Sequence, residues 1–426
     1  MTYRKKLIEV ALPLEAINKA SVQEKNNPFL KGHPRNIHQW WSRKPLATCR
    51  AVLFSQIVDD PSAHPESFPS EESQEAEWRR LFGIIEDLVI WENYNNEGVL
   101  LRAQAEIARS IARSLGEKMP EGIKAIRQYL TEKAPPVLDP FCGGGSIPLE
   151  AQCLGLRAYG SDLNPVAVLI TKALIEIPPK FVGNPPVNPE VHRDRRLIER
   201  DWFGAEGLAE DVRYYGKWIR DEAEKRIGKY YPKVKITAEM AKGRPDFKSY
   251  IGQELTVIAW LWVRTVLCPN PSCRARMPLV SSFWVSKKKG RMAFVQPVLD
   301  SVVRKVVLFD VRTNGQPLEP TTNRTGARCL FCGISLKKQQ LRTVAVENGV
   351  DVIPMGIVAE GDRSRVYLPS DALPVPQLEK PAVPFLEQPI AGDRRWFSPP
   401  LYGMLNFADL FTSRQLLALT TFSDLV

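Results

Sequence analysis

The chain lacks any apolar run that approaches the roughly 20 residues needed for a membrane-spanning helix. Near the N-terminus, Glu9 interrupts the short apolar stretch 7–10, where a signal-peptide core would lie. We therefore expect a soluble, cytoplasmic protein with no membrane partner. Cysteine is also scarce, with seven in 426 residues. Because that number is odd and too small for a secreted disulfide scaffold, metal-binding or free-thiol roles are expected instead.

Charge is distributed unevenly along the chain. There are 58 Lys and Arg residues against 48 Asp and Glu, which gives a net charge of +10. Residues 1–50 hold ten basic and three acidic residues, residues 59–121 hold six and fourteen, and residues 268–342 hold fourteen and three. Such a concentrated positive segment indicates a surface that faces a polyanion. The alternative is a solvated basic face with no partner.

The spacing of apolar residues divides the chain into five segments. Residues 1–134 are predicted to form a mostly helical N-terminal module. Residues 135–180 are predicted to form the first βαβα part of a parallel, doubly wound α/β sheet. Helical spacing follows in an insertion over 181–255, and residues 256–345 are predicted to be a β-rich ribbon with a basic hairpin. Residues 346–426 are predicted to be a proline-rich connector that leads into a final helix.

The most specific motif is D-P-F-C-G-G-G-S over 139–146, where a predicted strand ends and a helix begins. Glycines before a helix N-terminus let the backbone approach a ligand closely, and Ser146 is the expected N-cap. The G-x-G-x-x-G and G-K-S/T signatures are absent, so a nucleotide-like cofactor fits but phosphates are not the expected ligand. Asp162 follows at a distance that suits ribose recognition. The alternative is a glycine-rich turn with a solvated Asp162.

Two cysteine pairs predict a metal site. Cys268 and Cys273 are separated by four residues, and Cys329 and Cys332 by two. Two such pairs on turns beside strands can place four thiolates around one Zn²⁺. Four protein ligands leave no open position, so the zinc is expected to hold structure rather than activate water. Four buried free thiols are the alternative.

Basic residues on and beside the predicted ribbon indicate contact with the phosphates of double-stranded DNA. They are Lys287, Lys288, Lys289, Arg291, Arg304, Lys305, Lys337 and Lys338. Such contacts position a duplex without reading its sequence. A further motif, H-Q-W-W-S-R-K-P over 38–45, could stack a base or cover a cofactor, although Trp40 and Trp41 could equally be core anchors.

The glycine motif, D-P-F-x-G-x-G, resembles the first motif of the amino-group DNA methyltransferases, which bind S-adenosylmethionine. The resemblance implies that Asp139 contacts the methionine ammonium and that Asp162 holds the ribose hydroxyls. Phe141 would pack beside the cofactor and Leu163 would touch its adenine ring. The implied cofactor-binding set is Asp139, Phe141, Gly143, Gly145, Ser146, Asp162 and Leu163. By position, the motif over 38–45 is similar to the one that completes the cofactor pocket in such enzymes.

Together with the opening L-I-E-V-A-L-P-L and the cysteine ribbon, these motifs resemble the adenine-specific DNA methylases that carry a zinc ribbon and an N-terminal domain of unknown function. The resemblance runs along almost all of the chain. It implies a Rossmann-like methyltransferase sheet with an inserted zinc ribbon, and methylation of the adenine amino group. Some members of the family are linked to restriction-modification or phage defence.

The catalytic loop of that family, Asp/Asn-Pro-Pro-Tyr/Phe, is missing. The Pro-Pro pairs of this chain lack the preceding acid or amide or the following aromatic residue. The final helical pattern also stops without a cap, which suggests a truncated chain. We therefore expect a fragment that binds cofactor weakly and turns over little, with the catalytic residues unknown and the catalytic half absent or supplied by another chain. The alternatives are a non-catalytic zinc-ribbon DNA-binding protein, or an amino-methyltransferase acting on cytosine or RNA.

Overall fold

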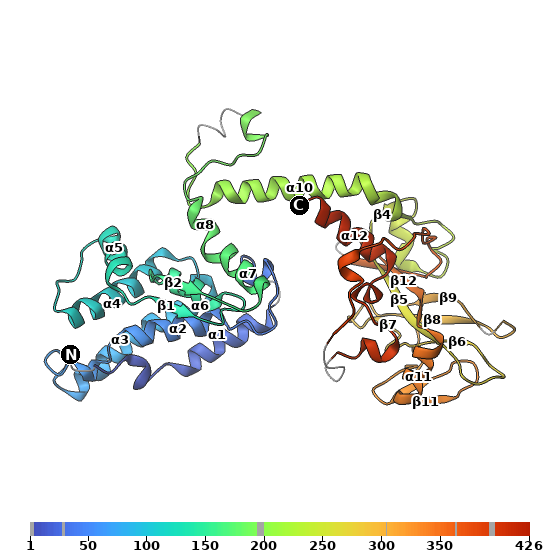
Figure 1. The fold of residues 1–426 in the computed structure, drawn as a ribbon, viewed down its shortest axis with the longest axis horizontal. Coiled ribbons are helices and arrows are strands. Elements are labelled where there is room, and N and C mark those ends of the chain that lie inside the picture. Colours follow the sequence, from blue (N-terminus) through green and yellow to red (C-terminus); the bar gives the residue numbers. More distant parts are fainter. Residues whose placement is uncertain (1–3, 28–29, 194–199, 304, 363, 392–396) are drawn as a thin grey trace. The chain divides into compact units, whose positions relative to one another are not determined.

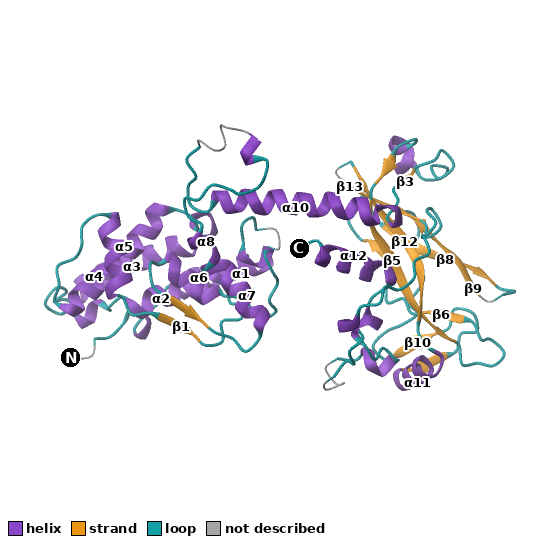
Figure 2. Ribbon diagram, turned by 45° about the horizontal axis from the view of Figure 1, so that its top comes forward, coloured by secondary structure: helices purple, strands orange, loops and turns teal. Residues whose placement is uncertain are grey.

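The computed structural model describes residues 4–27, 30–193, 200–303, 305–362, 364–391 and 397–426. The chain divides into two compact units, Met1–Tyr214 and Tyr215–Val426 (Figure 1). Helices dominate the first unit, whereas the longer strands belong to the second (Figure 2). A mixed α/β chain with a helical N-terminal part is therefore confirmed. No helix in these described ranges combines the length and the apolar character needed to cross a membrane.

The N-terminal part of the first unit is built from helices. Within the described residues they are α1 (Leu14–Asn26), α2 (Leu46–Ile57), α3 (Glu71–Val89), α4 (Glu97–Leu115) and α5 (Ile123–Lys133). The boundaries of α4 follow from its sequence. The Asn96 side chain accepts hydrogen bonds from the amides of Gly98 and Val99, and Gly116 ends the helix in the left-handed region at φ 68°.

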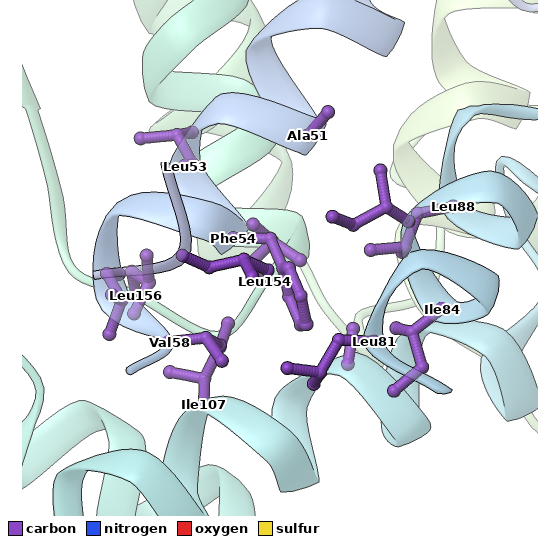
Figure 3. Close-up of a cluster of buried hydrophobic side chains, with 14 of the residues drawn as sticks. Ala51, Leu53, Phe54, Val58, Leu81, Ile84, Leu88, Ile107, Leu154 and Leu156 are labelled. Atoms are coloured by element: carbon purple, nitrogen blue, oxygen red, sulfur yellow. The ribbon is translucent and has the colours of Figure 1, made fainter. Parts of the chain in front are cut away.

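Apolar side chains of α2, α3 and α4 meet in one core. Figure 3 shows Phe54 of α2, Leu81 of α3 and Ile107 of α4 in this cluster, together with Leu154 and Leu156. The last two residues follow the glycine motif in sequence. The helical module and the segment that carries the glycine motif therefore share one hydrophobic core.

The glycine motif lies in a short βαβα unit. Its elements are β1 (Val137–Asp139), α6 (Ser146–Cys153), β2 (Ala158–Gly160), α7 (Pro165–Ile175) and α8 (Ile177–Lys180). The two strands pair in parallel, with Asp139 opposite Gly160. Asn164 caps α7 by accepting a hydrogen bond from the Val166 amide at 3.0 Å. The order of elements matches the prediction, and the described part of this sheet consists of these two strands.

The second unit is centred on an antiparallel sheet with the strand order β13-β12-β5-β6. Its strands are β5 (Val257–Leu267), β6 (Arg276–Pro278), β12 (Asp351–Gly361) and β13 (Ser364–Leu368). A second sheet contains β7 (Trp284–Ser286), β8 (Ala293–Asp300) and β9 (Lys305–Arg312). A hairpin of β10 (Gly326–Arg328) and β11 (Ser335–Lys337) precedes α11 (Lys338–Asn348). The pairing of β7 with β8 confirms the predicted hairpin with a basic tip.

The predicted ribbon boundary at residue 345 is too early. β12 lies beyond it, yet pairs with β5 from Asp351 opposite Thr265 to Ala359 opposite Val257. The proline-rich segment after it also contributes, because the Ser370 hydroxyl accepts a hydrogen bond from the Phe309 amide at 2.9 Å. Long-range strand pairing of this kind joins segments that sequence spacing treats as separate.

The described part of residues 181–255 contains two short strands besides the expected helical structure. α10 (Glu206–Ile227) is long, but β3 (Val234–Lys235) and β4 (Glu254–Leu255) then pair, and their residues join the core under β12 and β13. The final helix is α12 (Ser413–Asp424), capped by Thr412. The short 3-10 helices of the described residues are Leu7–Glu9, Pro34–Asn36, Pro61–Ala63, Trp91–Asn93, Val191–Arg193, Gly228–Tyr230, Pro245–Tyr250, Pro384–Leu386, Pro399–Tyr402 and Phe407–Leu410.

A buried polar network ties the start of the chain to the helical core. Asp59 accepts hydrogen bonds from Lys6 Nζ at 2.6 Å and from Ser114 Oγ at 3.4 Å. The Oδ2 atom of Asp59 also lies 2.9 Å from His64 Nε2, within hydrogen-bond distance. Burial of Asp59 favours its neutral form, but the hydrogen bonds from Lys6 and His64 outweigh burial and lower the pKa of Asp59 below its usual value. The ionised carboxylate is therefore the form that the fold stabilises.

Replacement of Asp59 by Asn is expected to destabilise the protein at pH 7 by about 1–3 kcal/mol, because it removes charge-assisted hydrogen bonds from a buried site. A carboxyl group with a lowered pKa stabilises the fold above its unfolded pKa, near 3.9, and this contribution disappears as pH falls through the folded pKa. The difference between wild type and Asp59→Asn should therefore shrink between about pH 5 and pH 3. Urea unfolding at several pH values measures it.

Asp87→Asn is a suitable control, since Asp87 pairs with Arg102 at 2.6 Å on an exposed surface. Its effect should stay below about 1 kcal/mol. An Asp59→Asn effect that is equally small, or that grows at low pH, contradicts the assignment.

Candidate metal centre and cofactor site

The four predicted metal ligands come together in the second unit. Cys268 follows β5 and Cys273 precedes β6, while Cys329 and Cys332 occupy the turn between β10 and β11. Their Sγ atoms all lie within 4.8 Å of one another. Cys268 and Cys332 are 3.7 Å apart and Cys273 and Cys329 3.9 Å. A tetrahedron of thiolates at 2.3 Å from Zn²⁺ has edges of about 3.8 Å, which these two separations match, so the group is compatible with zinc.

The two cysteine turns have matching backbone geometry. In each turn the amide of the first cysteine donates across to the next strand, from Cys268 to the Ala275 carbonyl at 2.8 Å and from Cys329 to the Ile334 carbonyl at 2.9 Å. In each turn the residue after the second cysteine is left-handed: Gly333 at φ 75° and Arg274 at φ 51°. Glycine at position 333 is a sequence feature that indicates such a turn, because glycine readily adopts positive φ. Arginine at position 274 gives no such indication, because a non-glycine residue rarely adopts this conformation.

Two of the four thiols are held in their neutral form by burial, so a bound cation is needed to stabilise their thiolate forms. Burial raises the pKa values of Cys268 and Cys329, whereas Cys332 is exposed and the amide of Ile334 lowers its pKa to about 7. Buried thiolates require a compensating positive charge. A divalent metal ion supplies it, and with four sulfur ligands it has no open coordination position.

The second candidate site lies at the carboxyl ends of β1 and β2. Asp162 accepts hydrogen bonds from the amides of Gly143 and Asn164, both at 2.9 Å. These two hydrogen bonds hold the pKa of Asp162 below its usual value, and the one from Asn164 has the larger effect. Asp139 accepts a hydrogen bond from the Phe141 amide at 3.1 Å. The structure thus brings Asp139, Asp162 and the glycine turn together.

Apolar side chains stand exposed around these two acids. Phe141 is 82% exposed, Leu163 97% and Trp41 85%. Trp41 stacks on Trp40, with ring centroids 4.8 Å apart. Large apolar side chains gathered at the ends of parallel strands, beside two carboxylates, are typical of an open ligand-binding surface.

The glycines are required by contacts within the chain. Gly143 and Gly145 have φ values of 48° and 74°. A Cβ atom on Gly143 would lie 2.7 Å from Trp40 Nε1, and one on Gly144 would lie 2.8 Å from Arg43 Cζ. Arg43 also donates a hydrogen bond to the Gly144 carbonyl. The motif over 38–45 therefore covers one side of the glycine turn, a role that its sequence position only suggested.

Ser146 does not cap α6 as predicted. Gly145 occupies the N-cap position, and Ser146 is the first residue of the helix. The Ser146 hydroxyl is buried and donates a hydrogen bond to the Lys44 carbonyl at 2.9 Å. Because the left-handed turn at Gly145 places the helix start one residue earlier than predicted, Ser146 instead fastens the 38–45 motif to the glycine turn.

A buried ion pair fixes α6 against α2. Arg50 Nε donates to Glu150 Oε2 at 2.5 Å, and the side chains are 1% and 0% exposed. The Arg50 guanidinium also lies over the Tyr94 ring, 4.5 Å from its centroid. Burial raises the pKa of Glu150 even though Arg50 opposes that effect. Nothing in the sequence identified this pair, because the two residues are 100 positions apart.

Both histidines of the N-terminal loop are engaged within the chain. His33 is buried and its Nε2 lies 2.9 Å from Glu24 Oε1, while Glu24 also accepts hydrogen bonds from the amides at the start of α2. His38 contacts the Gln39 carbonyl. The metal-compatible group found in the described residues consists of the four cysteines and includes neither histidine.

The predicted DNA-contacting residues fall into three separate places. Residues 287–291 form the turn between β7 and β8, Lys305 begins β9 at the opposite end of β8, and Lys337 and Lys338 lie where β11 meets α11. Arg304 is outside the described residues. The structure adds Arg365 of β13 to the first group, because it lines the same groove as Lys287 and Lys288.

Comparison with known proteins gives one match. Residues 11–84 match a family described as a protein of unknown function, DUF1156. No curated protein and no solved structure matches the chain. The matched region covers α1, α2 and the motif over 38–45, and therefore includes the part of the chain that packs on the glycine turn.

Proposed function

We propose that this chain is the cofactor-binding and DNA-binding part of an S-adenosylmethionine-dependent methyltransferase that acts on the exocyclic amino group of adenine in double-stranded DNA. The observation that carries the proposal is the placement of Asp139 at the end of one parallel strand and of Asp162 just after the other, next to a left-handed glycine turn. Exposed Phe141 and Leu163 supply apolar surface for a nucleoside next to these acids.

In this proposal Asp139 holds the positively charged amino group of the cofactor, and Asp162 accepts hydrogen bonds from its ribose. Each Asp162 oxygen already accepts one backbone amide, and each retains a second lone pair for a hydroxyl donor. Leu163 would touch the adenine ring and Phe141 would pack beside the cofactor. When bound, the cofactor supplies an electrophilic methyl group. The expected fold is a Rossmann-like methyltransferase sheet of which β1 and β2 are the first strands.

The second unit supports the DNA part of the proposal. The four-cysteine group, proposed to hold a structural zinc, fastens the ends of β5, β6, β10 and β11, and the segment around it is strongly basic. The catalytic residues are not assigned. An aromatic amine is a weak nucleophile and needs acceptors that localise its lone pair, and we propose that a partner chain with an Asp-Pro-Pro-Tyr loop supplies them. A role in restriction-modification or phage defence fits this chemistry.

Binding of S-adenosylmethionine to the purified chain tests the proposal, with isothermal titration calorimetry as the measurement. Wild type should bind the cofactor saturably, and Asp162→Ala should not. Because Asp162 also pins the glycine turn, a second variant is needed. Leu163→Glu changes a side chain that is 97% exposed, so it should leave stability unchanged and weaken binding at least about tenfold, or about 1.4 kcal/mol.

Leu169→Glu is the matched control, since Leu169 is also exposed, at 64%, but lies within α7 rather than at the strand ends. It should bind the cofactor like wild type. The cofactor assignment is wrong if wild type shows no saturable binding, or if Leu163→Glu and Asp162→Ala both bind like wild type.

One observation favours a second candidate function. Trp40 and Arg43 contact the glycine turn on the side where added Cβ atoms would point. If these contacts replace a ligand rather than border one, the chain is a non-catalytic zinc-ribbon DNA-binding protein. It would then bind DNA without binding the cofactor. Amino groups of cytosine or of RNA bases remain alternative acceptors, because the same chemistry serves both amines.

A further inference from the structure

A groove lined by cationic side chains lies in the second unit, between the β7–β8 turn and the strands β12 and β13. The β7–β8 turn contributes Lys287, Lys288 and Arg291, and β12 and β13 contribute Glu360 and Arg365. The groove has a volume of about 680 Å³. The β7–β8 turn and Arg365 are some 70 residues apart in sequence, so their proximity is a property of the tertiary structure alone.

Three cations of this groove carry charges that no carboxylate of the described residues neutralises. Lys287, Lys288 and Arg365 are exposed, and no ion pair joins any of them to a carboxylate in the described ranges. Glu360 is the acidic residue in the lining. Other arginines of this unit are paired, such as Arg276 with Asp351 and Arg312 with Asp310. The groove therefore keeps a net positive charge, whereas carboxylates neutralise some of the arginines elsewhere in the unit.

Side chains with apolar surface also line the groove. Ile258 of β5 is 48% exposed there, and half-buried Tyr367 of β13 lies beside it across β12. A lining that combines unpaired cationic side chains with some apolar surface suits a sugar–phosphate backbone, because the cations can neutralise phosphates and the apolar side chains can contact deoxyribose.

We propose that this groove is the surface through which the chain holds the backbone of duplex DNA. The inference rests on the proposed function for the presence of DNA, and adds where the duplex is held. The other basic groups lack these features. Lys337 and Lys338 stand where β11 meets α11 beside the cysteine turns, and Lys305 stands at the far end of β8. The lysines beside the metal site are thus not expected to contact DNA, whereas Arg365 is a DNA-contacting residue.

Two triple variants of the full chain, each with three positive charges removed, test the assignment. The groove variant is Lys287→Gln, Lys288→Gln and Arg365→Gln, and the control is Arg324→Gln, Lys337→Gln and Lys338→Gln beside the metal site. All six side chains are exposed. Binding of a fluorescent duplex is measured by anisotropy from about 50 to 200 mM salt. Zinc content and circular dichroism confirm that both variants are folded.

The groove variant should bind the duplex at least about tenfold more weakly than wild type. The slope of log K against log salt should fall by about 2–3, since each lost phosphate contact removes about 0.9. The control variant should stay within about threefold of wild type and keep its slope. Equal losses in both variants, or a larger loss in the control, would overturn the groove assignment while leaving DNA binding intact.

Other outcomes separate this inference from the proposed function. If wild type binds no duplex, both the groove assignment and the DNA part of the function are wrong. If wild type binds DNA through the groove but binds no S-adenosylmethionine, the groove stands and the methyltransferase assignment falls. Tighter binding to single-stranded DNA or RNA than to duplex would replace the proposed partner.

Discussion

Loss of one metal-binding cysteine is expected to release zinc and to unfold the strand ends that the metal connects. The Sγ atoms of Cys273 and Cys329 are 3.9 Å apart, and both cysteines lie in a small core with Met277 and Leu336. Binding energy at a structural zinc site is folding energy, since the ligands are not assembled in the unfolded chain. Cys273→Ser should therefore destabilise the second unit by more than about 4 kcal/mol.

Metal content and unfolding measure this effect together. Wild type should retain one zinc ion per chain through dialysis against a weak chelator, and Cys273→Ser should retain little. A strong chelator added to wild type should lower its unfolding midpoint to a similar extent. Cys153→Ser is the control, because Cys153 lies in α6 of the other unit, away from the four-cysteine group. Full zinc content and unchanged unfolding in Cys273→Ser would refute a structural metal.

Arg50→Met is expected to destabilise the first unit by about 3–5 kcal/mol, because it leaves the carboxylate of Glu150 buried without its cationic partner. Both side chains are almost fully buried, and they join the helical module to the glycine motif. The double variant Arg50→Met with Glu150→Leu should recover much of that loss, since two apolar side chains replace both charges. Urea unfolding measures each variant.

The pH dependence of Arg50→Met provides a second measurement. Burial already raises the pKa of Glu150, and loss of Arg50 removes the group that opposes this rise. A carboxyl with a raised folded pKa destabilises the fold as pH increases through that pKa, so the variant should be more stable near pH 5 than at pH 8. Arg79→Gln, which removes an exposed partner of Glu75, should cost less than about 1 kcal/mol. A similarly small cost in Arg50→Met would contradict a stabilising role for the buried pair.

Local features of the sequence were the most predictable. Asn164 followed by Pro165 is a local signal for the start of a helix, which α7 matches, and β1 lies where a strand was predicted before the glycine motif. The pairs of Cys268 with Cys273 and of Cys329 with Cys332 predicted a four-cysteine group, which the structure confirms. These signals depend on residues a few positions apart, so the sequence displays them directly.

Features that depend on distant contacts could not be predicted. Ser146 was expected to cap α6, but the close approach of Lys44 and Arg43 to the glycine turn decides its role. The extent of the ribbon was underestimated because β12 pairs with β5 across about 90 residues. The Arg50–Glu150 pair has no sequence signal at all, since an arginine and a glutamate are ordinarily exposed.

The sequence by itself determined the order of the βαβα elements, the positions of the two candidate acids and the identity of four cysteines that can hold a metal. Local backbone preference, apolar period and ligand spacing suffice for these, because each acts over a few residues. Only the tertiary structure decided that the 38–45 motif covers the glycine turn, and that Arg365 joins Lys287 and Lys288 at one groove. Packing of remote segments sets both, and no local pattern encodes it.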